Sequence, residues 1–183
     1  MRFDAAVYGP DAAALLALDG SGERLMPLAR GRCSSQEART RIRNLGERLF
    51  PGARHPRAAL AGIYLYFSCL EESHEVSQGV ADADGSFWHG IMHRQEPDSA
   101  NAAYWFRRAG QHPVFPALHA GALAIAGKYS GARLALADAW DPFAFTEICS
   151  SARDETERAA LEIQRLEWQL LFDYCARAAT EPA

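Results

Sequence analysis

The chain has 183 residues, of which 49% are hydrophobic and 23% charged, as in a folded globular protein of ordinary domain size. Its net charge of −4 lacks the basic footprint of a general nucleic-acid binder. The longest apolar run, residues 58–70, is too short for a membrane span, and acidic residues near the N-terminus argue against an export signal. We expect one cytoplasmic domain over residues 1–183, with no nucleic-acid or membrane partner.

Turn residues and capping residues divide the first third of the chain into helices. Pro10 stands in the favoured first turn of a short helix that Gly20 closes. Ser34 and Glu37 form a capping box for the next helix, which Pro51 ends. We therefore expect two helices before residue 52.

Residues 30–57 form an Arg-rich segment with eight arginines and only two acidic residues. One interpretation is a solvated face that pairs with acidic neighbours in the fold. The other is a site for an anion or a partner. We favour the first, because runs of charge are usually solvated faces.

A long helix is expected over residues 57–78, where apolar side chains recur at helical spacing after Pro56. Residues 80–85 then form a loop. Ser86 is the expected cap of the next helix, which Pro97 ends because its ring disfavours helical geometry in the residue before it.

The second half of the chain shows the same signals. Asp98 or Ser99 caps a helix that ends at Gly110, further helical segments begin at Pro113 and Pro116, and Asp141 caps another helix. The last and longest helix spans residues 154–178, and its first residue, an aspartate, is expected to open it.

No stretch alternates convincingly between apolar and polar residues as a strand would. Residues 132–137 come nearest, and their alanines favour a helix. The prediction is an all-α protein, a single-domain helical bundle.

Four cysteines are widely spaced and form no CxxC pair: Cys33, Cys69, Cys149 and Cys175. Without an export signal, free buried thiols are the expected state.

Residues 64–115 contain the most informative motifs. Residues 88–115 read WHGIMHRQEPDSANAAYWFRRAGQHPVF. This stretch resembles the signature of an uncharacterised bacterial and fungal protein family, WHxxMHRxExDxxNAxYWFRR. The likeness extends from the helix at residues 64–74 through residues 140–145 to the final helix, and it implies no particular activity.

The hairpin at residues 86–113 also resembles a tetratricopeptide or Sel1-type helical repeat. The spacing of small and aromatic packing residues matches at Gly90, Ala102, Phe106 and Ala109, and Pro113 follows one residue early. Histidines at positions 89 and 93 depart from the repeat pattern, and no second copy follows. The resemblance implies an αα-hairpin and no repeat array.

Four side chains suggest a metal site: Glu71, His74, His89 and His93. Glu71 and His74 share one side of their helix, and His89 and His93 share one side of the next. If the two helices are antiparallel neighbours, His74 lies beside His89 and Glu71 lies beside His93. Imidazole and carboxylate ligands suit a divalent metal such as Zn, Fe or Mn. The alternative is that His74 and His89 are hydrogen-bonded core histidines and His93 is exposed. His89 and His93 point away from the apolar face of their own helix, so they meet the preceding helix only if this helix is covered on both sides.

The next helix has a polar stripe. Asn101, Tyr104 and Arg108 share one face with Trp105 alongside, and this set suits a small polar or anionic ligand. A buried hydrogen-bond network would look the same. With Trp88, these residues are the candidate ligand-binding set.

Two functions remain open. The favoured one is a protein that binds a small polar ligand or a metal ion between helices 57–78 and 86–110, with His74, His93 and Glu71 as candidate catalytic groups if it is an enzyme. The alternative is a non-enzymatic module whose hairpin presents Trp88, Tyr104 and Trp105 to a protein partner. A homodimer is also left open.

Overall fold

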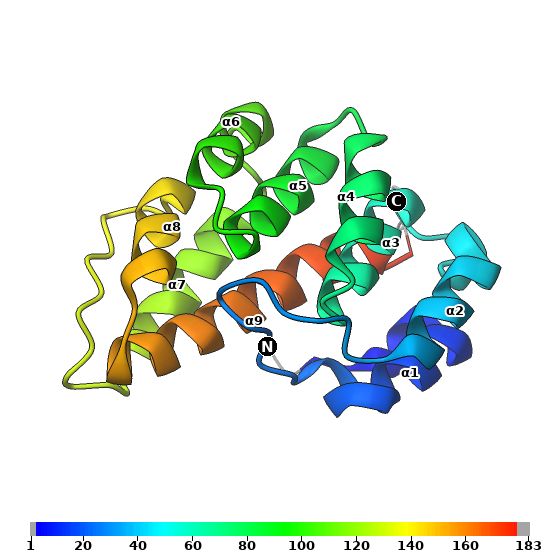
Figure 1. Cartoon of the computed structure of the whole chain (residues 1–183), viewed down its shortest axis with the longest axis horizontal. Coiled ribbons are helices and arrows are strands. Elements are labelled where there is room, and N and C mark those ends of the chain that lie inside the picture. The colour runs from blue at the N-terminus through cyan, green and yellow to red at the C-terminus, as the bar shows by residue number, and fades with distance from the viewer. Residues whose placement is uncertain (1–2, 179–183) are drawn as a thin grey trace, which may run out of the picture.

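The computed structural model describes residues 3–178, and within this range the chain is 68% helical and has no strand. One isolated antiparallel bridge joins Ala53 and Ala178. The all-α prediction is confirmed. The α-helices (Figure 1) are α1 (Pro10–Leu16), α2 (Gln36–Leu45), α3 (Pro56–Tyr66), α4 (Leu70–Gln78), α5 (Ala83–Gln95), α6 (Ser99–Ala109), α7 (Phe115–Ala126), α8 (Pro142–Ser151) and α9 (Asp154–Ala176), with short 3-10 helices at Ala5–Tyr8, Ala17–Gly22 and Gly46–Leu49.

The longest helix, α9, packs against α3, α7 and α8 and forms the axis of the core. Two tryptophans meet where α9, α3 and α5 approach one another. The indole nitrogen of Trp168 donates to the carbonyl of Gly62 at 2.8 Å. The ring of Trp88 covers the same glycine, where a Cβ would lie only 2.6 Å from the ring atom Cζ2. Glycine is therefore needed at position 62 for this three-helix contact.

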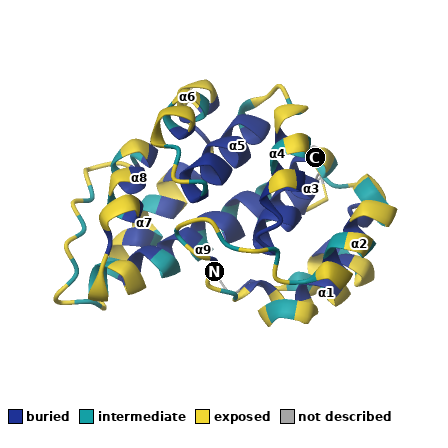
Figure 2. Cartoon of the chain, viewed as in Figure 1, coloured by how far each residue is buried: buried dark blue, intermediate teal, exposed yellow. Residues whose placement is uncertain are grey.

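Helix α5 is enclosed, with every residue from Asp84 to Gln95 buried (Figure 2). It contacts α3, α4 and α6. Because neighbours cover several sides, the face opposite Phe87 and Ile91 is also inside the molecule. The condition under which His89 and His93 can meet the preceding helix is therefore fulfilled.

A buried ion pair joins α5 to α9. Arg94 Nη1 donates to Glu167 Oε1 at 3.2 Å, and Arg94 Nη2 pairs with the other carboxylate oxygen. Both side chains are almost completely inaccessible. Gln164 accepts a further bond from Arg94 at 3.4 Å and donates to the carbonyl of Met26. The pair holds the helix of the two histidines against the core axis.

The expected continuous helix over residues 57–78 is wrong. It is divided into α3 and α4 at Ser68, whose φ of 56° is left-handed. Apolar periodicity continues across the break because both helices bury the same kind of face. The interruption redirects α4, and the side chain of Arg24 pairs with the freed carbonyl of Tyr66.

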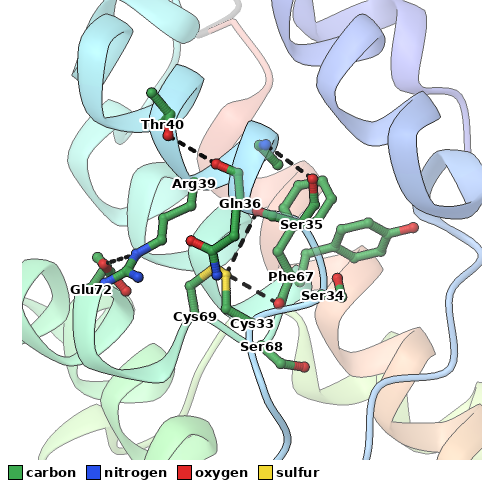
Figure 3. Close-up of a disulfide and its surroundings, with 12 residues drawn as sticks. Cys33, Ser34, Ser35, Gln36, Arg39, Thr40, Phe67, Ser68, Cys69 and Glu72 are labelled. Carbon is green, nitrogen blue, oxygen red and sulfur yellow. Dashed lines mark hydrogen bonds and ion pairs between the residues drawn. A yellow bond between two sulfur atoms is a disulfide. The ribbon is translucent and has the colours of Figure 1, made fainter.

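The expectation of four free thiols is also wrong. Cys33 and Cys69 form a disulfide (Figure 3). Cys149 and Cys175 are free and buried. The bridge joins the connecting segment, residues 23–35, to the start of α4. Ser34 N–H donates to Phe67 O at 2.7 Å beside it. Spacing alone did not indicate this pairing, because 36 positions separate the two cysteines.

Two helix starts differ from expectation by one residue. Ser35, not Ser34, caps α2 by accepting from Ala38 N–H at 3.0 Å, and Ser34 instead donates to Asp19 at 2.8 Å. Arg153 occupies the N-cap of α9, so the expected opening residue lies inside the first turn.

Helix α5 begins earlier than expected. Its cap is Asp82, which accepts from Gly85 N–H at 2.9 Å, and the predicted cap Ser86 lies within the first turn. The expected caps Asp98 and Asp141 are confirmed. Residues 132–137, expected to be helical, form an extended loop.

Acidic side chains lie beside the Arg-rich segment, as the first interpretation expected. Glu72 of α4 pairs with Arg39 and with Arg43, the latter at 3.2 Å. Glu71 pairs with Arg30 at 2.9 Å. Much of the positive charge is therefore balanced within the fold.

None of the helices in the described part of the chain combines the length and apolar character needed to cross a membrane.

Candidate metal centre

Three histidines from two helices form one compact cluster. His74 of α4 and His89 and His93 of α5 each offer a ring nitrogen, and these atoms all lie within 4.8 Å of one another. Ring centroids are 4.6 Å apart for His74 and His89, 5.4 Å for His74 and His93, and 4.8 Å for His89 and His93. Three of the four side chains that the spacing placed together therefore lie in the cluster, and the fourth, Glu71, does not.

The antiparallel packing of α4 and α5 produces this cluster. A short turn after Gln78 joins the two helices, so residues at similar distances from the turn come side by side (Figure 1). His89 and His93 are four residues apart and project from the same side of α5. The opposed helix supplies His74 at the same level.

Burial keeps the two α5 histidines neutral. His89 is 1% exposed and His93 is 7% exposed. Desolvation, reinforced by His93 and His74, lowers the pKa of His89 from 6.5 to about 3. Desolvation also lowers the pKa of His93, although Glu96 acts in the opposite direction. A neutral imidazole keeps the lone pair that a metal ion requires.

The hydrogen bonds expected of core histidines are not made in the described structure. His89 Nδ1 is buried and has no hydrogen-bond partner. His93 Nδ1 is buried too, and Glu96 Oε2 lies 3.2 Å from it without hydrogen-bond geometry. A buried polar atom without a partner costs about 1–3 kcal/mol, which calls for an explanation.

Glu71 does not join the cluster. Its carboxylate is largely exposed and pairs with Arg30; a hydrogen bond from its own backbone N–H, followed by the bond from Arg30, lowers its pKa. A different carboxylate, that of Glu96, contacts the cluster, with Oε2 3.2 Å from His93 Nδ1. Glu96 follows the last turn of α5, three residues after His93, and the i, i+3 relation was a signal that sequence reasoning missed.

Trp105 of α6 covers the cluster from another side. Its ring stacks on His89, with centroids 3.9 Å apart and planes inclined by 16°. The close approach of α6 to α5 depends on Gly90, where a Cβ would lie 2.6 Å from the ring of Phe106. Phe106 is 2% exposed, whereas Trp105 is only half-buried.

The polar stripe on α6 divides into separate roles. Asn101 bonds to the cap Asp98, with its side-chain nitrogen 2.7 Å from Oδ2. Tyr104 is exposed, and the guanidinium of Arg108 lies 5.9 Å from its ring centre and 5.4 Å from that of Trp105. The Trp105 ring therefore has both His89 and Arg108 as neighbours.

Trp88 belongs to the core and not to a binding surface. It is completely buried against Gly62. The candidate ligand set therefore loses Trp88, and the interaction-module interpretation loses one of its three aromatic contacts. An exposed Tyr104 and a half-buried Trp105 remain.

A second cluster with ligand-type side chains was not expected. Atoms of His55, Asp82 and Asp84 lie within 4.8 Å of one another. However, Asp84 Oδ1 is 2.8 Å from His112 Nε2, and Asp82 serves as the cap of α5. These contacts already use the carboxylates, so we interpret this cluster as a structural network between α3 and α5.

The fold and the site together define an all-α protein with a buried three-histidine cluster between two antiparallel helices. A comparison of the chain with protein-family models, curated proteins and solved structures finds no match. The two resemblances stated from sequence therefore stay predictions.

Proposed function

We propose that this protein binds one divalent transition metal ion through His74, His89 and His93, with zinc as the first candidate. The observation that supports it most directly is the convergence of three imidazole nitrogens within 4.8 Å inside the protein. Three nitrogen ligands suit zinc, iron or manganese, and zinc is most often held by nitrogen and sulfur donors.

Small side-chain rotations would complete the geometry. Nitrogens bound to zinc at about 2.0–2.1 Å in a tetrahedral site lie roughly 3.3 Å from one another. The present separations of up to 4.8 Å exceed this value modestly. Trp105 stacked on His89 restricts the orientation of that ring, so His74, which is only half-buried, has more freedom to adjust.

Three protein ligands leave a coordination position for water or substrate, as in catalytic zinc sites. Arg108 lies 5.4 Å from the centre of the Trp105 ring that stacks on His89, and its positive charge would favour an anion on this side of the centre. We therefore propose a small polar or anionic ligand as the occupant of the open position, and a metal-dependent reaction as the use of the centre.

Metal analysis of the purified protein tests the proposal. After removal of bound metal by a chelator and titration with zinc, the wild type should take up one ion per chain. His74→Gln should weaken binding at least tenfold without unfolding the protein, because His74 is half-buried. His119→Gln is the matched control, since His119 lies on α7 and contacts Ala137 O. Equal zinc uptake by the two variants would contradict the proposal.

The open position has its own test. Cobalt in place of zinc should give a visible spectrum that changes when an anion such as azide is added, as expected for an exchangeable ligand. Arg108→Gln should weaken the effect of azide while leaving cobalt affinity unchanged. A spectrum insensitive to anions would indicate a closed, structural site.

A further inference from the structure

The connecting segment, residues 23–35, crosses from α9 to the metal-site helices and is fastened at both ends. At one end, Gln164 of α9 donates to the carbonyls of Met26 and Pro27 at 2.9 and 3.1 Å. At the other end, Cys33 is bonded to Cys69, the residue that precedes α4 (Figure 3). The residues between these two points have little freedom to move.

Arg30 lies within this tethered stretch and reaches the candidate metal centre. Its Nη2 atom is 2.9 Å from Glu71 Oε1 and 3.9 Å from Glu96 Oε1. The other oxygen of Glu96 lies 3.2 Å from His93 Nδ1. A short chain of charged contacts therefore leads from the disulfide through Arg30 to a carboxylate beside the histidine cluster.

We infer that Glu96 can serve as a fourth metal ligand, and that the Cys33–Cys69 disulfide weakens metal binding by holding Arg30 against this carboxylate. The inference rests on the proposed function. With the bridge closed, Arg30 attracts Glu96 and adds positive charge near the cation. With the bridge open, only hydrogen bonds such as that of Ser34 N–H to Phe67 O hold this end of the segment, so Arg30 moves away more easily and Glu96 can turn to the metal and complete a four-ligand site.

Opening the bridge requires a dithiol reductant. It supplies two electrons and two protons, the S–S bond breaks, and thiols form at Cys33 and Cys69 while the reductant becomes a disulfide. Cys33 is half-buried and Cys69 is fully buried, so Cys33 is the sulfur that an incoming thiolate can attack.

The position of α4 does not depend on the bridge. Ser73 Oγ donates to Ala61 O at 3.0 Å, and Leu70 is buried in the core, so α4 stays docked on α3 without the disulfide. His74 therefore keeps its place when the bridge opens. The change is confined to Arg30 and to the carboxylates that it contacts.

Zinc affinity of three variants, compared with that of the oxidised wild type, tests the inference. Cys33→Ser/Cys69→Ser stands for the open bridge and avoids new thiols that would themselves bind zinc. Arg30→Gln removes the charge while the bridge stays closed. Each should bind zinc roughly fivefold more tightly than the oxidised wild type, about the upper value for an exposed ion pair. Their combination should add little to either, because both act through Arg30.

Two controls separate this effect from others. Arg32→Gln removes an exposed charge from the same segment and should leave affinity unchanged. Glu96→Gln should abolish the gain in the Cys33→Ser/Cys69→Ser background, whereas Glu71→Gln should preserve most of it. Thermal unfolding of each variant establishes that it is folded.

The outcomes are distinct. Equal zinc affinity in the wild type, the bridge-free variant and Arg30→Gln would overturn this inference and leave the proposed function standing. Weaker binding by the bridge-free variant would overturn it as well, because the bridge would then preorganise the site. If no folded variant binds zinc, the proposed function itself fails.

Discussion

The indole ring of Trp105 lies parallel to the imidazole of His89, with ring centroids 3.9 Å apart. This stack joins α6 to the histidine cluster on α5. It gives one of the four tryptophans a direct contact with a candidate metal ligand. The other three lie elsewhere in the core.

Tryptophan emission should therefore report metal binding. Copper(II) quenches a nearby indole, so titration of the metal-free wild type should reduce its fluorescence in proportion to site occupancy. Trp105→Phe should lose most of this response and retain metal binding. Trp140→Phe is the control, because Trp140 packs against Phe145 away from the cluster, and it should keep the response. Full quenching in Trp105→Phe would show that copper binds elsewhere.

Phe106 should be essential to the packing of α6 on α5. Its ring is 2% exposed and rests on Gly90. Phe106→Ala should lower the free energy of unfolding by about 3–5 kcal/mol, the usual cost of deleting a buried aromatic ring. Phe143→Ala, at a site 38% exposed, should cost much less. Denaturant unfolding of both proteins measures the difference, and similar costs would contradict the proposed packing.

Gly90 tests the same contact from the other helix. A Cβ at this position would lie 2.6 Å from two carbons of the Phe106 ring, so Gly90→Ala should destabilise the fold by about 1–3 kcal/mol through overpacking. The matched control is Gly127→Ala at the end of α7, where the nearest atom is 3.6 Å away. A neutral or stabilising Gly90→Ala substitution would mean that α6 can move away at little cost.

The buried pair of Arg94 and Glu167 should be sensitive to loss of one partner. Arg94→Met leaves a carboxylate buried and uncompensated, which should cost about 3–5 kcal/mol in the free energy of unfolding. Lys128→Met breaks an exposed pair with Glu162 and should cost less than about 1 kcal/mol. Equal costs in chemical denaturation would show that water reaches Glu167 freely.

The metal-free protein should lose stability as pH falls from 6.5 toward 4.5. Burial lowers the pKa of His89 in the folded state to about 3, whereas the unfolded chain takes up this proton near pH 6.5. The unfolded state therefore binds more protons in this window, and the free energy of unfolding decreases as the pH falls. Carboxylates, whose ordinary pKa is near 4.5, affect the free energy of unfolding mainly below this pH window.

His89→Gln provides the comparison for this pH dependence. The variant lacks the titrating ring, so its free energy of unfolding should vary less with pH between 6.5 and 4.5 than that of the wild type. The control is His119→Gln, which removes a half-buried ring on α7 outside the cluster and should retain the wild-type slope. Identical slopes in the wild type and His89→Gln would mean that His89 titrates normally in the fold.

Local signals in the sequence determined the helical architecture. Helix ends at Asp98, Gly110 and Asp141 were predictable because caps and left-handed glycines act through neighbouring backbone atoms. The convergence of His74, His89 and His93 was also within reach, since helical spacing and a short turn set which residues share a level.

Only the tertiary structure decided the features that depend on residues far apart in the chain. The Cys33–Cys69 bridge joins residues 36 positions apart and fastens the connecting segment to the start of α4. Glu71 pairs with Arg30 outside the cluster, whereas Glu96 contacts His93. Periodicity records which side of a helix is apolar, but not which distant chain will compete for a charged group. The positions of the folded segments decide which charged side chains pair with one another. Only the tertiary structure therefore shows which carboxylate lies beside the candidate metal centre.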